Sequence, residues 1–490
     1  MRASGILLPI SSLPGAYGIG GFSKEAYEFV DWLVKCGQKY WQILPLGPTG
    51  YGDSPYQAFS TFAGNPYFIS LETLYEQGLI TEEELEAQKR PENNAYIDYG
   101  ELFQNRRTAL KAAYGRFEKS EEFKRFCEDN AIWLNDYALY RTLKDKTGGL
   151  AWYDWEHKYK FRNSSTMKRL FREYADDIGF YCFLEYEFDR QWKALKSYAN
   201  ERGIRIIGDL PIYVSMDSAD AWSSPKLFKY DKDLVPKCVA GCPPDYFSPT
   251  GQLWGNPVYN WRYHKKTGYA WWIERLKRSF ELYDVLRLDH FRGFASYYEI
   301  PFGAETAING EWVKGPGMDL FNTVKEHLGN VPVIAEDLGM LTEDVFELIA
   351  DSGYPGMKVL EFAFGSGSDN LYLPHNHIKN SIVYTGTHDN ETLMGWLGSA
   401  DENCRRHVRD YLGRSGCDDG TAAEALIRTA LASTADTCII PMQDHLRLGN
   451  EARLNTPATL GDNWKWRMAA GSCTDEMAEN IRSITQLYGR

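Results

Sequence analysis

Three apolar segments of this chain end abruptly in a carboxylate, and this pattern constrains the fold more than any other feature. They span residues 285–289, 331–336 and 381–389, and their final acids are Asp289, Glu336 and Asp389. A buried strand that ends in charge is typical of a barrel, whose active site opens at the carboxyl ends of its strands. A separation of about 50 residues between these acids fits a repeating β/α unit.

A surface ion pair at the end of a strand is the structural alternative for each of these segments, since such pairs give the same local pattern. The pattern recurs, however, at 205–211, where an apolar run ends in Asp209. Repetition at several strand ends favours the barrel over isolated ion pairs.

Eight short apolar runs alternate with helical patterns along the chain. We expect strands at 6–8, 40–46, 205–211, 283–289, 331–336, 357–362, 381–386 and 438–442. This alternation predicts a closed (β/α)8 TIM barrel of the α/β class. Residues 1–490 would form a single catalytic barrel, with no separate C-terminal β domain.

Two long segments interrupt this alternation. Residues 64–200 are rich in charge and helical spacing, with a capping-box start at Thr81, so we expect a mainly helical insertion after the second strand. Residues 212–275 lack a period and are rich in Gly, Pro and aromatics. We expect an irregular insertion there, after the third strand, that carries an active-site loop.

Charge and cysteine usage narrow the class of partner. With 54 Lys and Arg against 67 Asp and Glu, the net charge is −13, which disfavours nucleic acid and anionic membranes. The nine cysteines are scattered and odd in number, which favours reduced thiols and a cytoplasmic location.

Only Cys238 and Cys242 form a close pair, without the further ligands that a zinc site needs. No run approaches the ~20 apolar residues of a membrane helix.

The strand-end acids have the chemistry of a glycosidase. Cleaving a glycosidic bond by retention needs a proton donor and a nucleophilic carboxylate about 5 Å apart. Asp289 and Glu336 end consecutive strands, and the short Asp suits the nucleophile while the longer Glu suits the proton donor. A neighbouring Asp289 anion would raise the pKa of Glu336. Arg287 lies on the same strand face as Asp289 and could keep it ionised; simple charge pairing is its alternative role.

Other interpretations of these acids stay open. Asp389 could bind two neighbouring hydroxyls of a sugar. His290 and His388 could also bind sugar hydroxyls, although a single His is more often structural. Asp209 and the three acids could instead hold a divalent metal, as in metal-dependent isomerases. Neither a His-x-His motif nor a clustered acidic triad supports the metal. The sequence content of 15 Trp, 32 Tyr and 24 Phe suits sugar stacking but does not choose sugars by itself.

Motifs along nearly the whole chain resemble the amylomaltase family, the 4-α-glucanotransferases or disproportionating enzymes of glycoside hydrolase family 77. They are LPISSLPG at 8–15, YWQILPLGP at 40–48, SPYQ at 54–57, GNP at 64–66, GDLPIYV at 208–214, PPDYF at 243–247, RLDHFRG at 287–293, AEDLG at 335–339 and THDN at 387–390. So many motifs in the same order are highly specific.

The resemblance implies a glycosyltransferase that moves part of an α-1,4-glucan to the 4-hydroxyl of another glucan or glucose by retaining double displacement. It implies Asp289 as nucleophile, Glu336 as acid/base and Asp389 as transition-state stabiliser. It further implies these substrate-binding residues: Ser54, Tyr56, Asp209, Arg287, His290 and His388 around the cleavage point, and Tyr246, Phe247, Gln252 and Trp254 on a loop over the acceptor side. Loop packing is the alternative role of Tyr246 and Phe247.

The resemblance also implies partners and cofactors. Maltooligosaccharides, amylose and glucose would be donors and acceptors, in the metabolism of maltooligosaccharides, starch or glycogen. We expect no metal, no organic cofactor, and a monomer or weak homodimer. Two rival classes remain. An α-amylase-type hydrolase would use the same three acids. A non-catalytic glucan-binding protein would be expected to have lost one of them, and none is lost.

Overall fold

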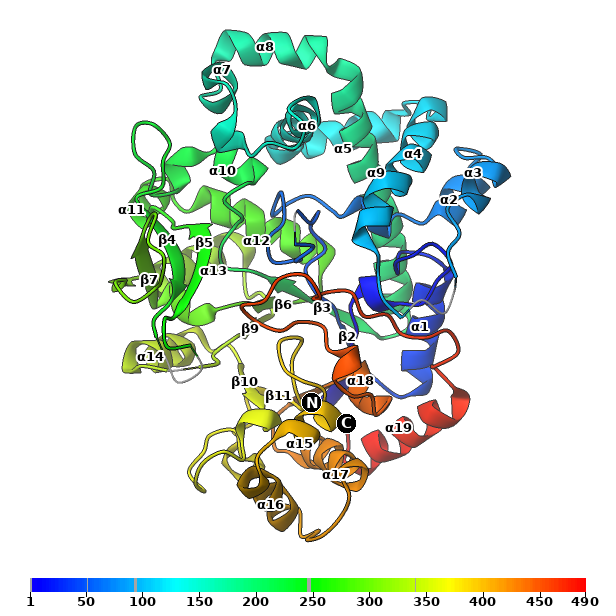
Figure 1. Ribbon diagram of the computed structural model, residues 1–490, viewed down its shortest axis with the longest axis vertical. Helices are drawn as coiled ribbons and strands as arrows, with labels where there is room; N and C mark the ends of the chain where they lie inside the picture. Colours follow the sequence, from blue (N-terminus) through cyan, green and yellow to red (C-terminus); the bar gives the residue numbers. More distant parts are fainter. Residues whose placement is uncertain (1, 51, 92–94, 245–247, 340) are drawn as a thin grey trace.

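Eight parallel strands of the computed structural model close into one barrel in the order β1-β12-β11-β10-β9-β6-β3-β2 (Figure 1). Their bounds are β1 (Ala3–Leu7), β2 (Tyr40–Gln42), β3 (Arg205–Leu210), β6 (Val285–Leu288), β9 (Val333–Ala335), β10 (Gly356–Val359), β11 (Ser381–Tyr384) and β12 (Thr437–Pro441). The structure describes residues 2–50, 52–91, 95–244, 248–339 and 341–490. The expected (β/α)8 barrel is confirmed, and each expected apolar run supplies one of its strands.

The barrel closes through β1 and β12, which pair from Ala3 opposite Thr437 to Leu7 opposite Pro441. Every residue of both strands is buried. Strands covered on both faces carry continuous rather than alternating apolar residues, which explains why short apolar runs marked them in the sequence.

Helices that cover the barrel do so with an apolar face. In α1 (Lys24–Lys35), Phe29, Val30 and Leu33 are buried, as expected for helical spacing. The other helices outside the first insertion are α10 (Ala219–Ser223), α11 (Trp261–Lys266), α12 (Ala270–Leu282), α13 (Met318–Leu328), α14 (Glu343–Ser352), α15 (Leu393–Ser399), α16 (Glu402–Tyr411), α17 (Asp419–Ala432), α18 (Met442–His445) and α19 (Asp475–Leu487). Among the described residues after β12 there is no further strand.

The segment between β2 and β3 is helical. It contains α2 (Leu71–Glu76), α3 (Glu82–Glu86), α4 (Tyr99–Arg116), α5 (Glu121–Asp129), α6 (Ala131–Lys146), α7 (His157–Lys160), α8 (Ser164–Glu173) and α9 (Ala175–Glu201). The capping box expected at Thr81 is present: the Glu84 N–H donates to the Thr81 hydroxyl, and the Thr81 N–H donates to the Glu84 carboxylate. Figure 1 shows these helices forming a lobe beside the barrel, with α9 leading back to it.

The segment 212–275 is less irregular than expected. It contributes β4 (Cys238–Cys242) and β5 (Gln252–Pro257) to a four-stranded antiparallel sheet of order β5-β4-β7-β8. The other two strands, β7 (Ser296–Pro301) and β8 (Glu311–Lys314), come from beyond β6. Strands β4 and β5 escaped the sequence pattern because each contains a Gly, both lack a clear alternation, and they pair across a β-bulge near Val239.

Candidate active site

Polar side chains from adjacent barrel strands meet at the carboxyl ends of β3, β6 and β9. Asp209 in β3 lies directly opposite Arg287 in β6. Leu288, the last residue of β6, lies opposite Ala335, the last residue of β9, so Asp289 and Glu336 each follow the end of one of two neighbouring strands. The strand count from the sequence had placed these two acids on consecutive strands, and the barrel order confirms it.

Arg287 links Asp209 to Asp289. Its Nη1 donates to both Asp209 oxygens at 2.8 and 2.7 Å and to Asp289 Oδ1 at 3.0 Å. Burial raises the pKa of Asp289 to about 6, while the Arg287 charge acts to lower it. The Asp289 side chain keeps 26% of its surface exposed, so the carboxylate faces the barrel opening while Arg287, 3% exposed, lies beneath it. Asp289 is therefore an accessible anion above about pH 6.

Glu336 is held by two backbone N–H groups. The N–H of His290 donates to Oε2 at 2.7 Å, and the N–H of Leu338 donates to Oε1 at 2.8 Å. His290 has a φ of 51°, a left-handed conformation that is uncommon for a residue with a side chain and is often found at functional sites. Burial is the largest cause that raises the pKa of Glu336 to about 7, and the Asp289 charge adds to it. Like-charge repulsion, expected as the cause from the sequence, is thus secondary to burial.

Asp389 joins the same site from the segment that follows β11. Its Oδ2 lies 3.3 Å from His388 Nε2, and its Oδ1 accepts from Asn455 Nδ2 at 2.6 Å. Burial acts to raise the pKa of Asp389, but the His388 imidazole and the Asn455 amide outweigh it and hold the pKa below the usual range of an aspartate. The Asp389 charge also raises the pKa of Asp289. The three carboxylates therefore interact within one site, with Asp389 ionised throughout the neutral range.

Tyr56 connects Asp209 to His388. Its hydroxyl donates to Asp209 Oδ2 at 2.7 Å and lies 3.4 Å from His388 Nδ1, and its ring stacks on His388 with a centroid distance of 5.0 Å. Ser54 lies two residues earlier, and its hydroxyl accepts from the Tyr56 N–H at 3.2 Å. The residues that the family resemblance grouped around the cleavage point are thus brought together, with Ser54 positioned to hold the backbone of Tyr56.

The sheet β5-β4-β7-β8 brings two further expected residues to the site. The Trp254 ring meets the His290 ring edge to face at 4.9 Å, and its indole N–H donates to Gln252 Oε1 at 3.0 Å. Burial and Arg292 lower the pKa of His290 to about 3, so its imidazole is neutral. Tyr246 and Phe247, expected on the covering loop, lie outside the described residues.

Comparison with known proteins decides the family. The family model of glycoside hydrolase family 77, described as 4-alpha-glucanotransferase, matches residues 8–473. The chain belongs to this family. It is 49% identical over 98% of its length to the 4-alpha-glucanotransferase of Clostridium butyricum, 99% of which is covered, and 44% identical over 100% of its length to that of Thermus thermophilus, also covered to 99%. Its activity is of the 4-alpha-glucanotransferase type.

A solved structure within this family has nearly the same fold. The amylomaltase from Streptococcus agalactiae in complex with acarbose superposes with a TM-score of 0.96 at 41% sequence identity, and the match covers 100% of both chains. The expected family and fold class are therefore confirmed.

The C-terminal segment brings residues to this glucanotransferase site that the sequence did not predict. Besides Asn455, the Arg453 guanidinium donates to the Asp389 carbonyl at 2.8 Å, and the Trp464 ring lies 5.5 Å from Tyr56 and 5.9 Å from His388. Figure 1 shows this orange-red stretch, between α18 and α19, crossing beside the barrel. The stretch lacks an apolar period and has no strand of its own, so no periodic pattern could have placed it there.

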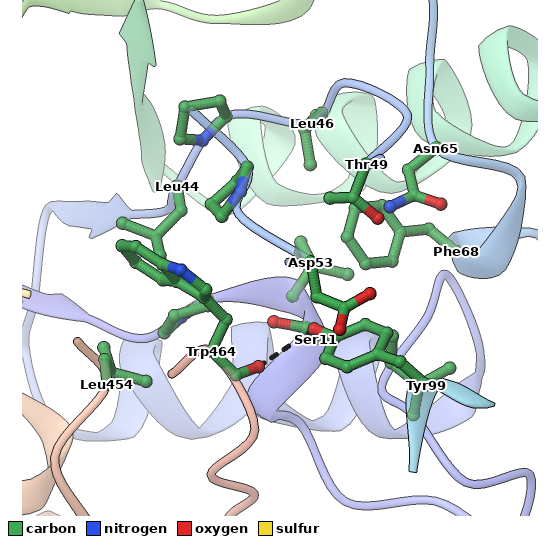
Figure 2. Close-up of a pocket in the computed structure, with 15 residues that line it drawn as sticks. Ser11, Leu44, Leu46, Thr49, Asp53, Asn65, Phe68, Tyr99, Leu454 and Trp464 are labelled. Carbon is green, nitrogen blue, oxygen red and sulfur yellow. Dashed lines mark hydrogen bonds between the residues drawn. The ribbon is translucent and has the colours of Figure 1, made fainter. Parts of the chain in front are cut away.

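A pocket beside the site shows how this segment is anchored (Figure 2). Leu454 and Trp464 line one side of the pocket and face Leu44. The Trp464 carbonyl accepts from the Tyr99 hydroxyl of the helical insertion at 2.9 Å. Three segments thus pack together next to Tyr56: the helical insertion, the loop that follows β2, and the C-terminal segment.

Two further findings concern the described residues only. They contain no group of three or more His, Cys, Asp or Glu side chains that could hold a metal ion. Nor do they contain a helix that is both long and apolar enough to cross a membrane.

Proposed function

We propose that this chain transfers a segment of an α-1,4-glucan to the 4-hydroxyl of an acceptor glucan or glucose, by retaining double displacement through a covalent glucosyl-enzyme. The observation that carries the proposal is the pairing of Asp289 and Glu336 at the ends of adjacent strands. Arg287 favours the anion of Asp289, while burial favours the acid form of Glu336. A nucleophile and a proton donor need these opposite states.

In the first step, an Asp289 oxygen attacks the anomeric carbon and the glycosidic C–O bond breaks. Glu336 gives its proton to the departing 4-oxygen, so the leaving glucan departs as a neutral alcohol. In the second step, the Glu336 carboxylate takes the proton of an acceptor 4-hydroxyl, whose oxygen displaces Asp289 from the anomeric carbon. Two inversions at that carbon give overall retention.

Asp389 has the role of stabilising the transition state. Its anion would hold sugar hydroxyls at the ring that Asp289 attacks, and its contacts with His388 and Asn455 fix its orientation. Ser54, Tyr56, Asp209, His290 and His388 would bind the sugars on either side of the broken bond. Charged groups held in place in a site that excludes water stabilise a transition state more strongly than the same groups do in water.

Transfer to a glucan rather than to water requires that the acceptor reach the intermediate first. Trp254 offers an aromatic face beside His290, and Gln252 fixes its indole. We propose that they, with Tyr246 and Phe247, bind the acceptor and exclude water. The acarbose held by the related amylomaltase supports an α-glucan as the ligand class. A cytoplasmic location is part of the proposal.

The test is the disproportionation of maltotriose. Asp289→Asn should lower kcat by a factor on the order of 10⁴ or more while oligosaccharide binding remains, because only the nucleophile is removed. Asp284→Asn is a matched control: Asp284 precedes the other end of the same strand, where it pairs with Lys196, and its loss should leave kcat nearly unchanged. Near-normal turnover by the Asp289 variant would refute the assignment.

Product analysis separates transfer from hydrolysis. A transferase forms glucose and longer chains from maltotriose without a net gain of reducing ends, because each bond broken is replaced by one formed. A hydrolase of the α-amylase type would raise the number of reducing ends with time. A glucan-binding protein without activity would change neither.

A further inference from the structure

Asp337 directly follows the proton donor Glu336, and its side chain binds the neighbouring barrel strand. Its Oδ1 accepts from the Met357 N–H in β10 at 2.6 Å. Only 5% of Asp337 is exposed, and Met357 is fully buried. The Asp337 carboxyl group is therefore enclosed between β9 and β10, at a point that the proposed reaction does not use.

The junction between β9 and β10 is the shortest in the barrel. In the described part of the chain, one residue pair joins these strands, Ala335 opposite Gly356. Every other pair of neighbouring barrel strands is joined by three or more residue pairs. The bond between Asp337 and Met357 lies just beyond the last residue of β9, so it holds this strand end to β10 where the backbone pairing stops.

The start of β10 fits closely around the carboxyl group. A Cβ atom at Gly356 would collide with the Asp337 carboxyl group, which lies against the Gly356 backbone. Two residues further along, Lys358 Nζ lies 3.9 Å from Asp337 Oδ2, and the Lys358 side chain is only 12% exposed. One oxygen of Asp337 thus meets a backbone donor and the other faces a cation.

The backbone of Glu336 is fixed on its other side by β6 and the turn that follows it. Its N–H donates to the Leu288 carbonyl at 3.1 Å, and its carbonyl accepts from the Phe291 N–H at 3.1 Å. These bonds hold the main chain at residue 336, but they do not reach the residues after it.

Residue 337 determines one of the two donors to the Glu336 carboxylate. The Leu338 N–H donates to Glu336 Oε1 at 2.8 Å. This N–H belongs to the peptide group that joins residues 337 and 338, so its direction depends on how Asp337 is held. The bond from the Met357 N–H to the Asp337 side chain supplies that hold.

We propose that Asp337 is a positioning residue that keeps the Glu336 carboxyl group in its active geometry, by fixing the Leu338 N–H through its own bond to β10. The inference rests on the proposed role of Glu336 as acid and base. Displacing a catalytic group by about 1 Å can lower a rate about 100-fold, so Asp337 can govern kcat without touching the sugar.

The experiment compares Asp337→Ala with Asp337→Asn on maltotriose, with kcat expressed per folded molecule. Asp337→Ala removes the oxygen that binds the Met357 N–H, and kcat should fall about 10- to 100-fold with KM changed less than about twofold. Asp337→Asn keeps an oxygen for Met357 and should hold kcat within about threefold of the natural chain. Both variants lack the charge that faces Lys358, so the difference between them reports the hydrogen bond. An unchanged kcat in the Ala variant, or an equal loss in the Asn variant, overturns the proposal.

The pH profile separates positioning from a general loss of stability. Without a fixed Leu338 N–H, the Glu336 carboxylate loses a hydrogen bond that favours its ionised form, so the pKa of Glu336 should rise. The alkaline limb of kcat/KM should therefore lie at higher pH in Asp337→Ala than in Asp337→Asn, by about half a unit or more. Coincident alkaline limbs in the two variants would contradict the proposal.

Asp284 provides a matched control at the opposite end of the barrel strands. It too accepts a backbone N–H of a neighbouring strand, that of Ile206 at 2.8 Å, and it pairs with Lys196. Asp284→Ala should lose stability but keep kcat and the position of its alkaline limb. A loss of kcat as large as that in Asp337→Ala would mean that any such break between barrel strands lowers the rate, and would overturn the proposal.

A glycosyl fluoride donor tests whether Asp337 acts through Glu336. Fluoride leaves without a proton, so the first step does not use the Glu336 carboxyl group. In a Glu336→Gln background, adding Asp337→Ala should therefore change the rate of first-turnover fluoride release less than about threefold. A loss as large as that on maltotriose would show that Asp337 acts through another group, such as Arg287, whose Nε donates to Met357 Sδ at 3.4 Å. That result would overturn the proposal.

Glu336→Gln distinguishes this inference from the proposed function. If Glu336→Gln keeps its full kcat on maltotriose, the role of Glu336 is wrong, and the proposed function with it. If Glu336→Gln is inactive on maltotriose and Asp337→Ala is fully active, only the role of Asp337 is wrong.

Discussion

At the scale of single residues, Asp289 and Glu336 require opposite protonation states, and their surroundings supply them over a narrow pH range. The pKa of Asp289 is raised to about 6 and that of Glu336 to about 7. Below about pH 6 the nucleophile gains a proton, and above about pH 7 the acid loses one. We predict a bell-shaped profile of kcat/KM with its maximum between these values, since kcat/KM reports the free enzyme. In Glu336→Gln the alkaline limb should vanish; a limb that persists would mean that another group causes it.

Arg287 offers a second test at this scale. Its Nη1 contacts Asp289 at 3.0 Å, and its charge acts to lower the pKa of that acid. In Arg287→Met the pKa of Asp289 should rise, so the acid limb of kcat/KM should move to higher pH by about one unit or more. Arg278→Met is the control, because Arg278 pairs with Asp189 in another buried ion pair. The acid limb of Arg278→Met should stay in place even if that variant is less stable. An unmoved acid limb in Arg287→Met would contradict the proposed effect of Arg287 on the pKa of Asp289.

The sequence pattern placed the residues at strand ends, and the family resemblance pointed to others such as Tyr56 and Trp254, but neither pointed to Asn455, for a physical reason. Strands that alternate with helices are parallel, so their carboxyl ends lie at one end of the barrel. That alternation therefore places Asp209, Arg287, Asp289 and Glu336 together. Asn455 reaches Asp389 across 66 residues of chain, and only the folded path of an aperiodic segment brings it there.

At the scale of elements, strands buried on both faces and helices with one apolar face could be predicted, and the small antiparallel sheet could not. The barrel strands are short apolar runs whose neighbours follow from chain order. Strand β4, in contrast, pairs with β7, so that Val239 lies opposite Ile300. Pairing between strands so far apart in the chain, one of which (β4) contains a Gly, leaves no local signal.

Helix α9 carries a prediction of its own, because it buries an acid against the chain that follows β2. Glu185 accepts from the Gly64 N–H at 2.8 Å, and burial raises the pKa of its carboxyl from 4.5 to about 8. The folded state therefore binds this proton more tightly than the unfolded state. The stability it contributes is present below pH 4.5 and is lost as the pH rises through 8.

Glu185→Gln removes this titration and keeps an oxygen for Gly64. Between pH 5 and pH 8 the free energy of unfolding of the natural chain should fall by on the order of a few kcal/mol more than that of the variant. Urea midpoints at the two pH values measure the difference. Equal slopes for the two proteins would show that Glu185 is not the group responsible.

At the scale of the whole molecule, the barrel depends on a junction between the two ends of the described chain, which lie side by side in Figure 1. The Arg490 guanidinium donates to backbone carbonyls of Ala3, Ser433 and Ala435 at 3.0, 2.9 and 2.9 Å. It thereby joins the first strand to the turn that precedes the last.

Arg490→Ala should lower the free energy of unfolding by about 1–3 kcal/mol, because several backbone acceptors lose their donor. The active site lies elsewhere, so kcat at 25 °C should be unchanged. Arg414→Ala, on a different exposed loop, is the control. A loss of kcat in Arg490→Ala, without a loss of stability, would contradict a purely structural role.

The central claim, that Asp289 becomes covalently bound to the sugar, can be measured on Glu336→Gln with a maltooligosaccharide α-fluoride as donor. Fluoride leaves without a proton, so the first step proceeds, whereas the second lacks its base and the intermediate accumulates. Peptide mass spectrometry should then find one glycosyl group, attached to Asp289. A glycosyl group on another residue such as Asp389, or none while fluoride is still released, would contradict the account.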